Sequence, residues 1–142
     1  ALMSILTGIL ADVADNPTDP QSIEIMYGAP LNSGNPGYSS KVQAWASISG
    51  GLPPTETPGL GERLAAAITP PAPGYLFAAT QDNQTPYQWS VDLRDQLVIA
   101  GAQVAFQSVV GGHVPYTTYK ELFNEQTARF FYFFMYLPGA EH

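Results

Sequence analysis

The chain contains no cysteine and almost no histidine. Among its 142 residues, only His113 and His142 have an imidazole. The absence of cysteine excludes a disulfide framework, a thiol nucleophile and a zinc-thiolate site. Because the sequence has no close cluster of histidines and carboxylates, we expect no metal site. The sequence indicates no other cofactor either.

Basic residues and long apolar runs are also scarce. The chain has 5 Lys and Arg against 12 Asp and Glu, which gives a formal net charge of −7 at pH 7. A chain of this charge repels phosphate backbones, so we expect no nucleic-acid partner. No apolar run reaches the roughly 18 residues that cross a bilayer, and no secretion signal is visible, so we expect no membrane partner. The cellular compartment is not indicated.

The hydrophobic content is sufficient for one folded core. Hydrophobic residues make up 45% of the chain and aromatic residues 12%. A chain of this length normally folds as one domain, which here spans residues 1–142.

Strand-like and helix-like segments alternate along the chain. Apolar runs bounded by Gly and Pro predict strands, and spacings of three and four residues predict helices. We expect strands over residues 42–49, 74–80 and 103–110, and helices over 1–14, 60–68, 87–100 and 117–136, with a short helical turn at 23–27. In the helix at 87–100, the apolar face is expected to contain Trp89, Leu93, Leu97 and Val98. This order predicts an α/β fold with a parallel sheet and helices on both faces.

Two chemically useful side chains follow predicted strands. Asp82 comes shortly after the second strand, and His113 follows the third strand and two glycines. Ligands and reactive groups gather at the carboxyl ends of parallel strands. We therefore expect this acid and this histidine to meet over the sheet.

The segment around these residues resembles a known family. The run LFAATQDNQTPYQWSVDLRDQLVIAGAQVAFQSVVGGHVPY is similar to the C-terminal third of esterases and lipases of the α/β-hydrolase fold. In that family a strand, an Asp, a Pro four residues later, a helix, a strand and Gly-His follow in this order. Residues 27–53 resemble the strand that precedes the acid, and residues 1–13 resemble the helix after the nucleophile.

The resemblance implies that Asp82 is the acid of a catalytic triad and His113 its base. The carboxylate would orient the imidazole, and the imidazole would take the proton of a serine hydroxyl and return it to the leaving alcohol. Two plainer interpretations stay open. In the first, Asp82 forms an Asx turn that caps the next helix instead of acting as a triad acid. In the second, His113 is a hydrogen-bonded loop residue instead of a catalytic base.

The nucleophile motif of the family is missing. Gly-x-Ser-x-Gly does not occur in the sequence, so the strained strand-to-helix turn that displays the serine is not encoded here. Ser49 is a weak substitute, because Leu52 and two prolines follow it where a helix should start. We expect the chain to be the C-terminal part of a hydrolase whose first half, or a second chain, covers the open edge of the sheet. Residues 1–142 alone should then be inactive.

Four residues beside the acid and the base are candidates for contact with a small ester substrate. They are Tyr87, Trp89, Val114 and Tyr116. Their apolar surfaces would line an acyl or aromatic pocket, and ordinary helix packing accounts for them equally well. The aromatic run at residues 130–136 is expected to pack in the core rather than to bind a membrane, because a basic face is lacking.

Two functions are therefore weighed for the chain. The first is a carboxylic ester hydrolase of the serine type, to which the chain contributes the acid and the base. The second is a non-catalytic interaction or structural protein that is built on part of the hydrolase fold and pairs through its exposed strand edge.

Overall fold

The computed structural model describes residues 42–53, 59–65 and 71–136. Six elements follow one another in this part of the chain. They are β1 (Trp45–Ile48), α3 (Leu60–Ala65), β2 (Gly74–Ala79), α4 (Tyr87–Ile99), β3 (Val104–Val109) and α5 (Tyr116–Tyr136). All three strands and three of the helices lie where the sequence predicts them. The helix expected at 1–14 and the turn expected at 23–27 lie outside the described residues.

The three strands form one parallel sheet in the order β1-β2-β3. Trp45 on β1 is opposite Gly74 on β2, and Ala79 on β2 is opposite Val109 on β3. The predicted α/β class with a parallel sheet is thus confirmed. Within the described residues, β1 pairs only with β2, so its other edge has no strand beside it.

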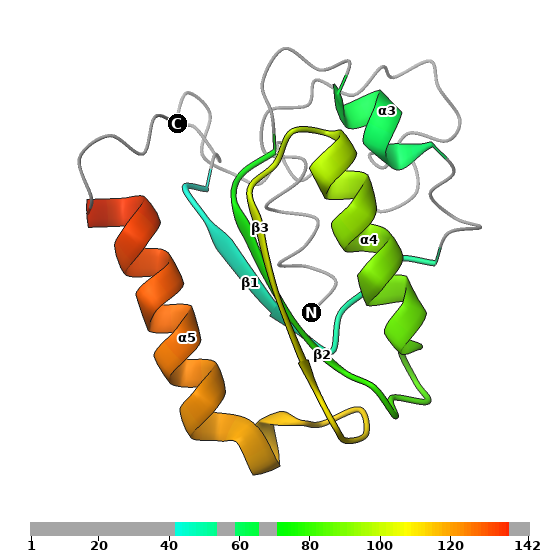
Figure 1. The fold of residues 1–142 in the computed structure, drawn as a ribbon, viewed down its shortest axis with the longest axis vertical. Coiled ribbons are helices and arrows are strands. Elements are labelled where there is room, and N and C mark those ends of the chain that lie inside the picture. Colours follow the sequence, from blue (N-terminus) through cyan, green and yellow to red (C-terminus); the bar gives the residue numbers. More distant parts are fainter. Residues whose placement is uncertain (1–41, 54–58, 66–70, 137–142) are drawn as a thin grey trace, which may run out of the picture.

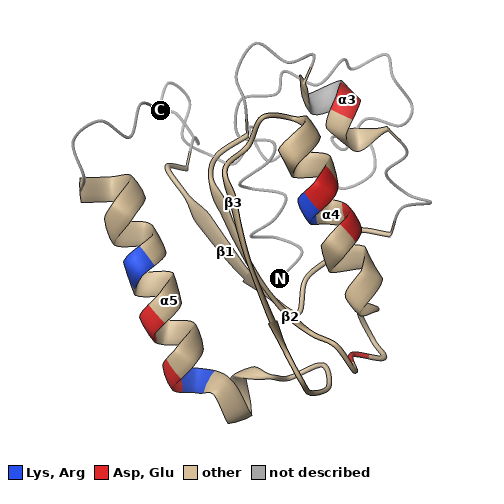
Figure 2. Cartoon of the chain, viewed as in Figure 1, with Lys and Arg blue, Asp and Glu red and all other residues tan. Residues whose placement is uncertain are grey.

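Helices cover both faces of this sheet. Figure 1 shows α5 along one face and α3 with α4 along the other. All six residues of the central strand β2 are buried, as expected for a parallel strand that is covered on both sides. Figure 2 shows that the charged residues of the described part lie mostly on the helices. The strands themselves contain none.

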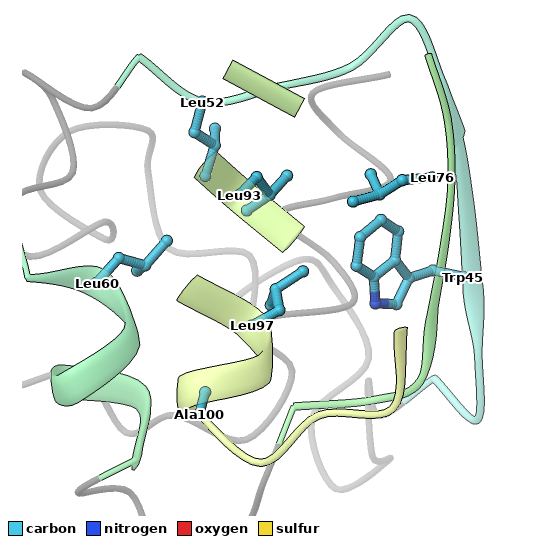
Figure 3. Packing of buried hydrophobic residues seen from close by; sticks show 7 residues of the cluster. All are labelled: Trp45, Leu52, Leu60, Leu76, Leu93, Leu97 and Ala100. Carbon is cyan, nitrogen blue, oxygen red and sulfur yellow. The ribbon is translucent and has the colours of Figure 1, made fainter. Parts of the chain in front are cut away.

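The core between the sheet and α4 is built around an indole ring. Figure 3 shows the converging side chains, which are Trp45, Leu52, Leu60, Leu76, Leu93, Leu97 and Ala100. The indole Nε1 of Trp45 donates a hydrogen bond to the carbonyl oxygen of Ala72 at 3.0 Å, so its polar atom is satisfied.

The expected apolar face of α4 is correct in part. Leu93 and Leu97 are buried, together with Ser90. Val98 is 58% exposed, so its assignment to the buried face is wrong. It lies one residue after Leu97, about 100° around the helix, and therefore points away from the stripe that faces the sheet.

The core on the α5 side is aromatic. Tyr75, Phe77, Ala79 and Val109 of the sheet pack against residues of α5 that include Tyr119, Leu122, Phe123 and Phe130. The rings of Phe77 and Phe123 meet edge to face with centroids 5.4 Å apart. Such pairs add stability beyond the apolar area that they bury.

The end of α5 packs less closely than the sequence suggests. Phe134 is buried, but four of its neighbours are 49% exposed or more, namely Tyr132, Phe133, Met135 and Tyr136. The expectation that residues 130–136 pack in the core is therefore wrong for these four, because only one side of a helix can face the sheet. None of the helices in the described part is long and apolar enough to cross a membrane.

Candidate active site

The register of the sheet brings Asp82 and His113 together. The ladder between β2 and β3 continues past the strand ends, where Thr80 N–H donates to the Val109 carbonyl at 2.9 Å. Gln81 N–H then donates to the Gly111 carbonyl, also at 2.9 Å. The two loops therefore leave the sheet side by side. Asp82 directly follows Gln81, and His113 is two residues after Gly111.

The carboxylate of Asp82 is buried and held by its own loop. Its side chain is 1% exposed, and Oδ1 accepts hydrogen bonds from the N–H groups of Gln84 and Thr85, each at 2.9 Å. Burial raises the pKa of this carboxyl. The bonds from Thr85, Gln84 and the His113 imidazole outweigh burial and leave the pKa of Asp82 below its ordinary value. The group is therefore ionised at neutral pH.

The imidazole of His113 binds this carboxylate through one nitrogen. Nδ1 lies 2.9 Å from Oδ2 and 3.1 Å from Oδ1 of Asp82. An ionised carboxylate only accepts hydrogen bonds, so Nδ1 is the atom that bears the proton. In the neutral ring, Nε2 is then the basic nitrogen. The His113 side chain is 32% exposed, which leaves the ring accessible from outside.

The Asx-turn interpretation of Asp82 also applies, with one difference. The bond from Gln84 N–H to Oδ1 forms an Asx turn. It does not cap α4, because the N-cap residue of that helix is Pro86 and no side chain caps it. The same carboxylate thus shapes its loop and binds His113.

The four candidate substrate contacts lie on two sides of this pair. Tyr87 and Trp89 are in the first turn of α4, and Tyr116 begins α5. Val114 follows His113 directly and is 61% exposed, and Tyr116 is 37% exposed. In the described part of the chain, no ring contact joins Tyr87 to Tyr116. The ring of Tyr87 contacts Phe106, and the ring of Tyr116 contacts Phe123.

Tyr87 has a structural contact that its position in the sequence did not reveal. Its hydroxyl lies 2.7 Å from Oγ of Ser108 on β3. This bond joins the start of α4 to the neighbouring strand and so fixes the end of the loop that contains Asp82. The only signal in the sequence is a tyrosine at the helix start, which does not identify its partner.

Ser49 combines a positive φ of 51° with burial. Its Oγ has no hydrogen-bond partner among the residues described. The backbone is strained there, as at a nucleophile turn. No helix follows in residues 50–53, however. Gly51 instead packs so closely on α4 that a Cβ would lie 2.8 Å from the Trp89 backbone.

No family model matches the chain, and no curated protein matches it. Among the described residues, no group of three or more His, Asp or Glu side chains is placed to hold a metal ion.

Proposed function

We propose that the chain supplies the acid and the base of a serine-type carboxylic ester hydrolase, and that its sheet is the C-terminal part of an α/β-hydrolase fold. The observation that supports this most directly is the bond from His113 Nδ1 to the buried carboxylate of Asp82. The resemblance of the sequence around these two residues to esterases and lipases agrees with it.

The geometry suits general base catalysis. Asp82 fixes the tautomer in which Nε2 of His113 is free to take a proton. In the reaction, Nε2 accepts the proton of a serine hydroxyl while the oxygen forms a bond to the ester carbonyl carbon. The imidazolium then returns that proton to the leaving alcohol, and a serine ester remains. Water repeats the sequence, releases the carboxylic acid and restores the serine.

We propose that the nucleophilic serine belongs to a polypeptide segment outside these 142 residues, beside β1. The sequence has no Gly-x-Ser-x-Gly motif. In the described residues, β1 has an unpaired edge, and the hydroxyls of Ser47 and Ser49 are buried without a partner. An unpaired apolar strand is a usual place for another strand to add.

A fluorophosphonate probe, which labels activated serines, tests this proposal. The protein is purified from cells that express its natural gene, with hydrolysis of p-nitrophenyl butyrate measured on the same sample. We expect turnover and a labelled serine in a segment that accompanies residues 1–142. His113→Ala and Asp82→Asn should lower kcat/KM by about 10³-fold or more, and Glu121→Gln, which removes an exposed charge on α5, should not.

Three results would contradict all or part of the proposal. Turnover that survives His113→Ala excludes His113 as the base. Labelling of Ser49 supports the esterase but refutes the external nucleophile. Absence of both turnover and labelling refutes the enzyme and favours a non-catalytic protein that pairs through β1.

A further inference from the structure

Within the described residues, the side chain of His113 is held by Asp82 alone. Val110, Gly111 and Gly112 separate β3 from His113, and two successive glycines restrict the backbone least of all residues. Among the described residues, the only hydrogen-bond partner of the imidazole is the carboxylate of Asp82. The orientation of His113 therefore depends on what fixes the backbone of this loop.

Two hydroxyls of α5 bind the loop on either side of His113. The hydroxyl of Tyr119 donates to the carbonyl oxygen of Val110 at 2.9 Å, three residues before the histidine. Oγ1 of Thr117 donates to the carbonyl of Val114 at 2.9 Å, one residue after it. The Val114 carbonyl also accepts a hydrogen bond from the N–H of Thr117, so the segment after the histidine has a second bond to α5. For the segment before the histidine, the bond to α5 comes from the side chain of Tyr119.

Tyr119 is itself held by its ring and by its backbone. Its ring packs on Phe77 of the central strand with centroids 6.4 Å apart, and its N–H donates to the carbonyl of Pro115 at 2.9 Å. Its backbone has φ −114° and ψ 25°, which are not helical values and mark a kink in α5. A Cβ on Gly111 would lie 4.0 Å from Cε2 of Tyr119, so the ring lies beside the glycine segment.

A continuous set of bonds thus links Tyr119 to both members of the pair. Tyr119 holds the Val110 carbonyl, and the next carbonyl, that of Gly111, accepts the N–H of Gln81. Gln81 precedes Asp82. Loss of the Tyr119 hydroxyl would remove the bond at Val110 and leave the ladder bonds at the Val109 and Gly111 carbonyls as the remaining ties of this segment to the sheet, so that His113 could turn away from the carboxylate more often.

We infer that Tyr119 is a positioning residue for His113, which it holds against Asp82 through the Val110 carbonyl. The inference rests on the proposed role of His113 as a base. Removal of one neutral hydrogen bond of this kind should raise the fraction of molecules with a displaced histidine by about fivefold.

The test measures the pair without requiring turnover. In the ¹⁵N-labelled protein, purified with any segment that accompanies residues 1–142, the exchange rate of the His113 Nδ1 proton with solvent is measured. The signal is assigned by its loss in His113→Ala. We expect Tyr119→Phe to raise this rate about fivefold, and to raise that of the Gln81 amide as well. Tyr132→Phe is the matched control, because it removes a hydroxyl from the exposed side of the same helix. It should leave both rates unchanged.

Two substitutions at the same site keep the test valid if Tyr119→Phe folds poorly. Tyr119→4-fluorophenylalanine fills the volume of the hydroxyl but donates no hydrogen bond, so it should show the faster exchange. Tyr119→4-aminophenylalanine restores a donor and should restore the slow rate. Equal exchange rates in the fluoro, amino and unmodified proteins would overturn the inference, even if their melting temperatures differ.

Kinetics separate this inference from the proposed function. In an active assembly, Tyr119→Phe should lower kcat only by the added fraction of molecules in which the histidine is displaced, with KM unchanged. Faster exchange in a protein that hydrolyses no ester would leave Tyr119 as the residue that holds His113 but would refute the esterase. Unchanged exchange in an active esterase would refute the role of Tyr119 alone.

Discussion

Ser47 and Ser90 are equally buried, each with 2% of its surface exposed, but only one of their hydroxyls has a partner. Oγ of Ser90 donates to the carbonyl oxygen of Gly50 at 2.8 Å and so ties α4 to the end of β1. Oγ of Ser47 has no hydrogen bond among the described residues. The two serines therefore offer opposite outcomes for the same substitution.

Ser90→Ala should destabilise the fold, and Ser47→Ala should not. Loss of the Ser90 hydroxyl leaves the buried Gly50 carbonyl unpaired, which costs about 1–3 kcal/mol of unfolding free energy. Loss of the Ser47 hydroxyl removes a polar atom that has no partner among the described residues, so the free energy of unfolding should be unchanged or higher. Urea denaturation of both variants measures the difference. A loss of stability in Ser47→Ala as large as that in Ser90→Ala would contradict this account of the two hydroxyls.

Gly74→Ala should destabilise the sheet through Trp45. The two residues are opposite each other on neighbouring strands, and a Cβ on Gly74 would overlap the indole ring. Overpacking of this kind costs about 1–3 kcal/mol. Gly112→Ala is the control, because a Cβ there meets nothing within 4 Å. Equal melting temperatures for the two variants would contradict this account of the core.

Asp82→Asn should remove a pH-dependent part of the stability. The pKa of Asp82 is below its ordinary value in the fold, so its ionised form stabilises the protein above about pH 4. That stability is lost as the pH falls through the folded pKa. Wild type should exceed Asp82→Asn by about 1.5–3 kcal/mol at pH 7, and this difference should shrink in the acid range. Chemical denaturation between pH 2 and 7 measures it, with Glu121→Gln as the control. A difference that does not vary with pH would refute the lowered pKa.

Tyr75 should resist ionisation at alkaline pH. Burial raises the pKa of its phenol to about 12, while its hydroxyl donates to Oε1 of Gln126 at 3.1 Å. A raised folded pKa gives stability that is complete below about pH 10 and is lost as the pH rises toward 12. Ultraviolet titration should therefore show a late phenol that disappears in Tyr75→Phe. In 6 M guanidinium chloride this late step should be absent, and its persistence there would exclude burial as the cause.

The elements of the sheet could be predicted from the sequence because burial leaves a local pattern. The run GYLFAA is apolar throughout and became the strand that is buried on both faces. Alternation of strands and helices predicts parallel pairing, and the sheet is parallel. Val98 was misplaced because an apolar residue beside Leu97 looks the same in the sequence whether or not it faces the sheet.

The site could be predicted only where backbone order determines it. Asp82 and His113 follow strands that are neighbours in the sheet, so topology alone predicts that they meet, and the structure shows a hydrogen bond between them. The partners of the tyrosine hydroxyls depend on distances across the fold. Tyr87 is 21 residues from its partner Ser108, and Tyr119 is 9 residues from its partner Val110. No periodicity in the sequence marks such pairs.

The order β1-β2-β3 has a consequence for inheritance. Because neighbouring strands are also consecutive along the chain, the acid, the histidine and the bonds between their loops all come from one uninterrupted stretch, residues 74–119. A single short stretch of gene can therefore transfer the complete pair to another protein. Closing its loops costs little entropy, but β2 also packs on Trp45 and Phe130, so a scaffold that receives this stretch must replace those two contacts.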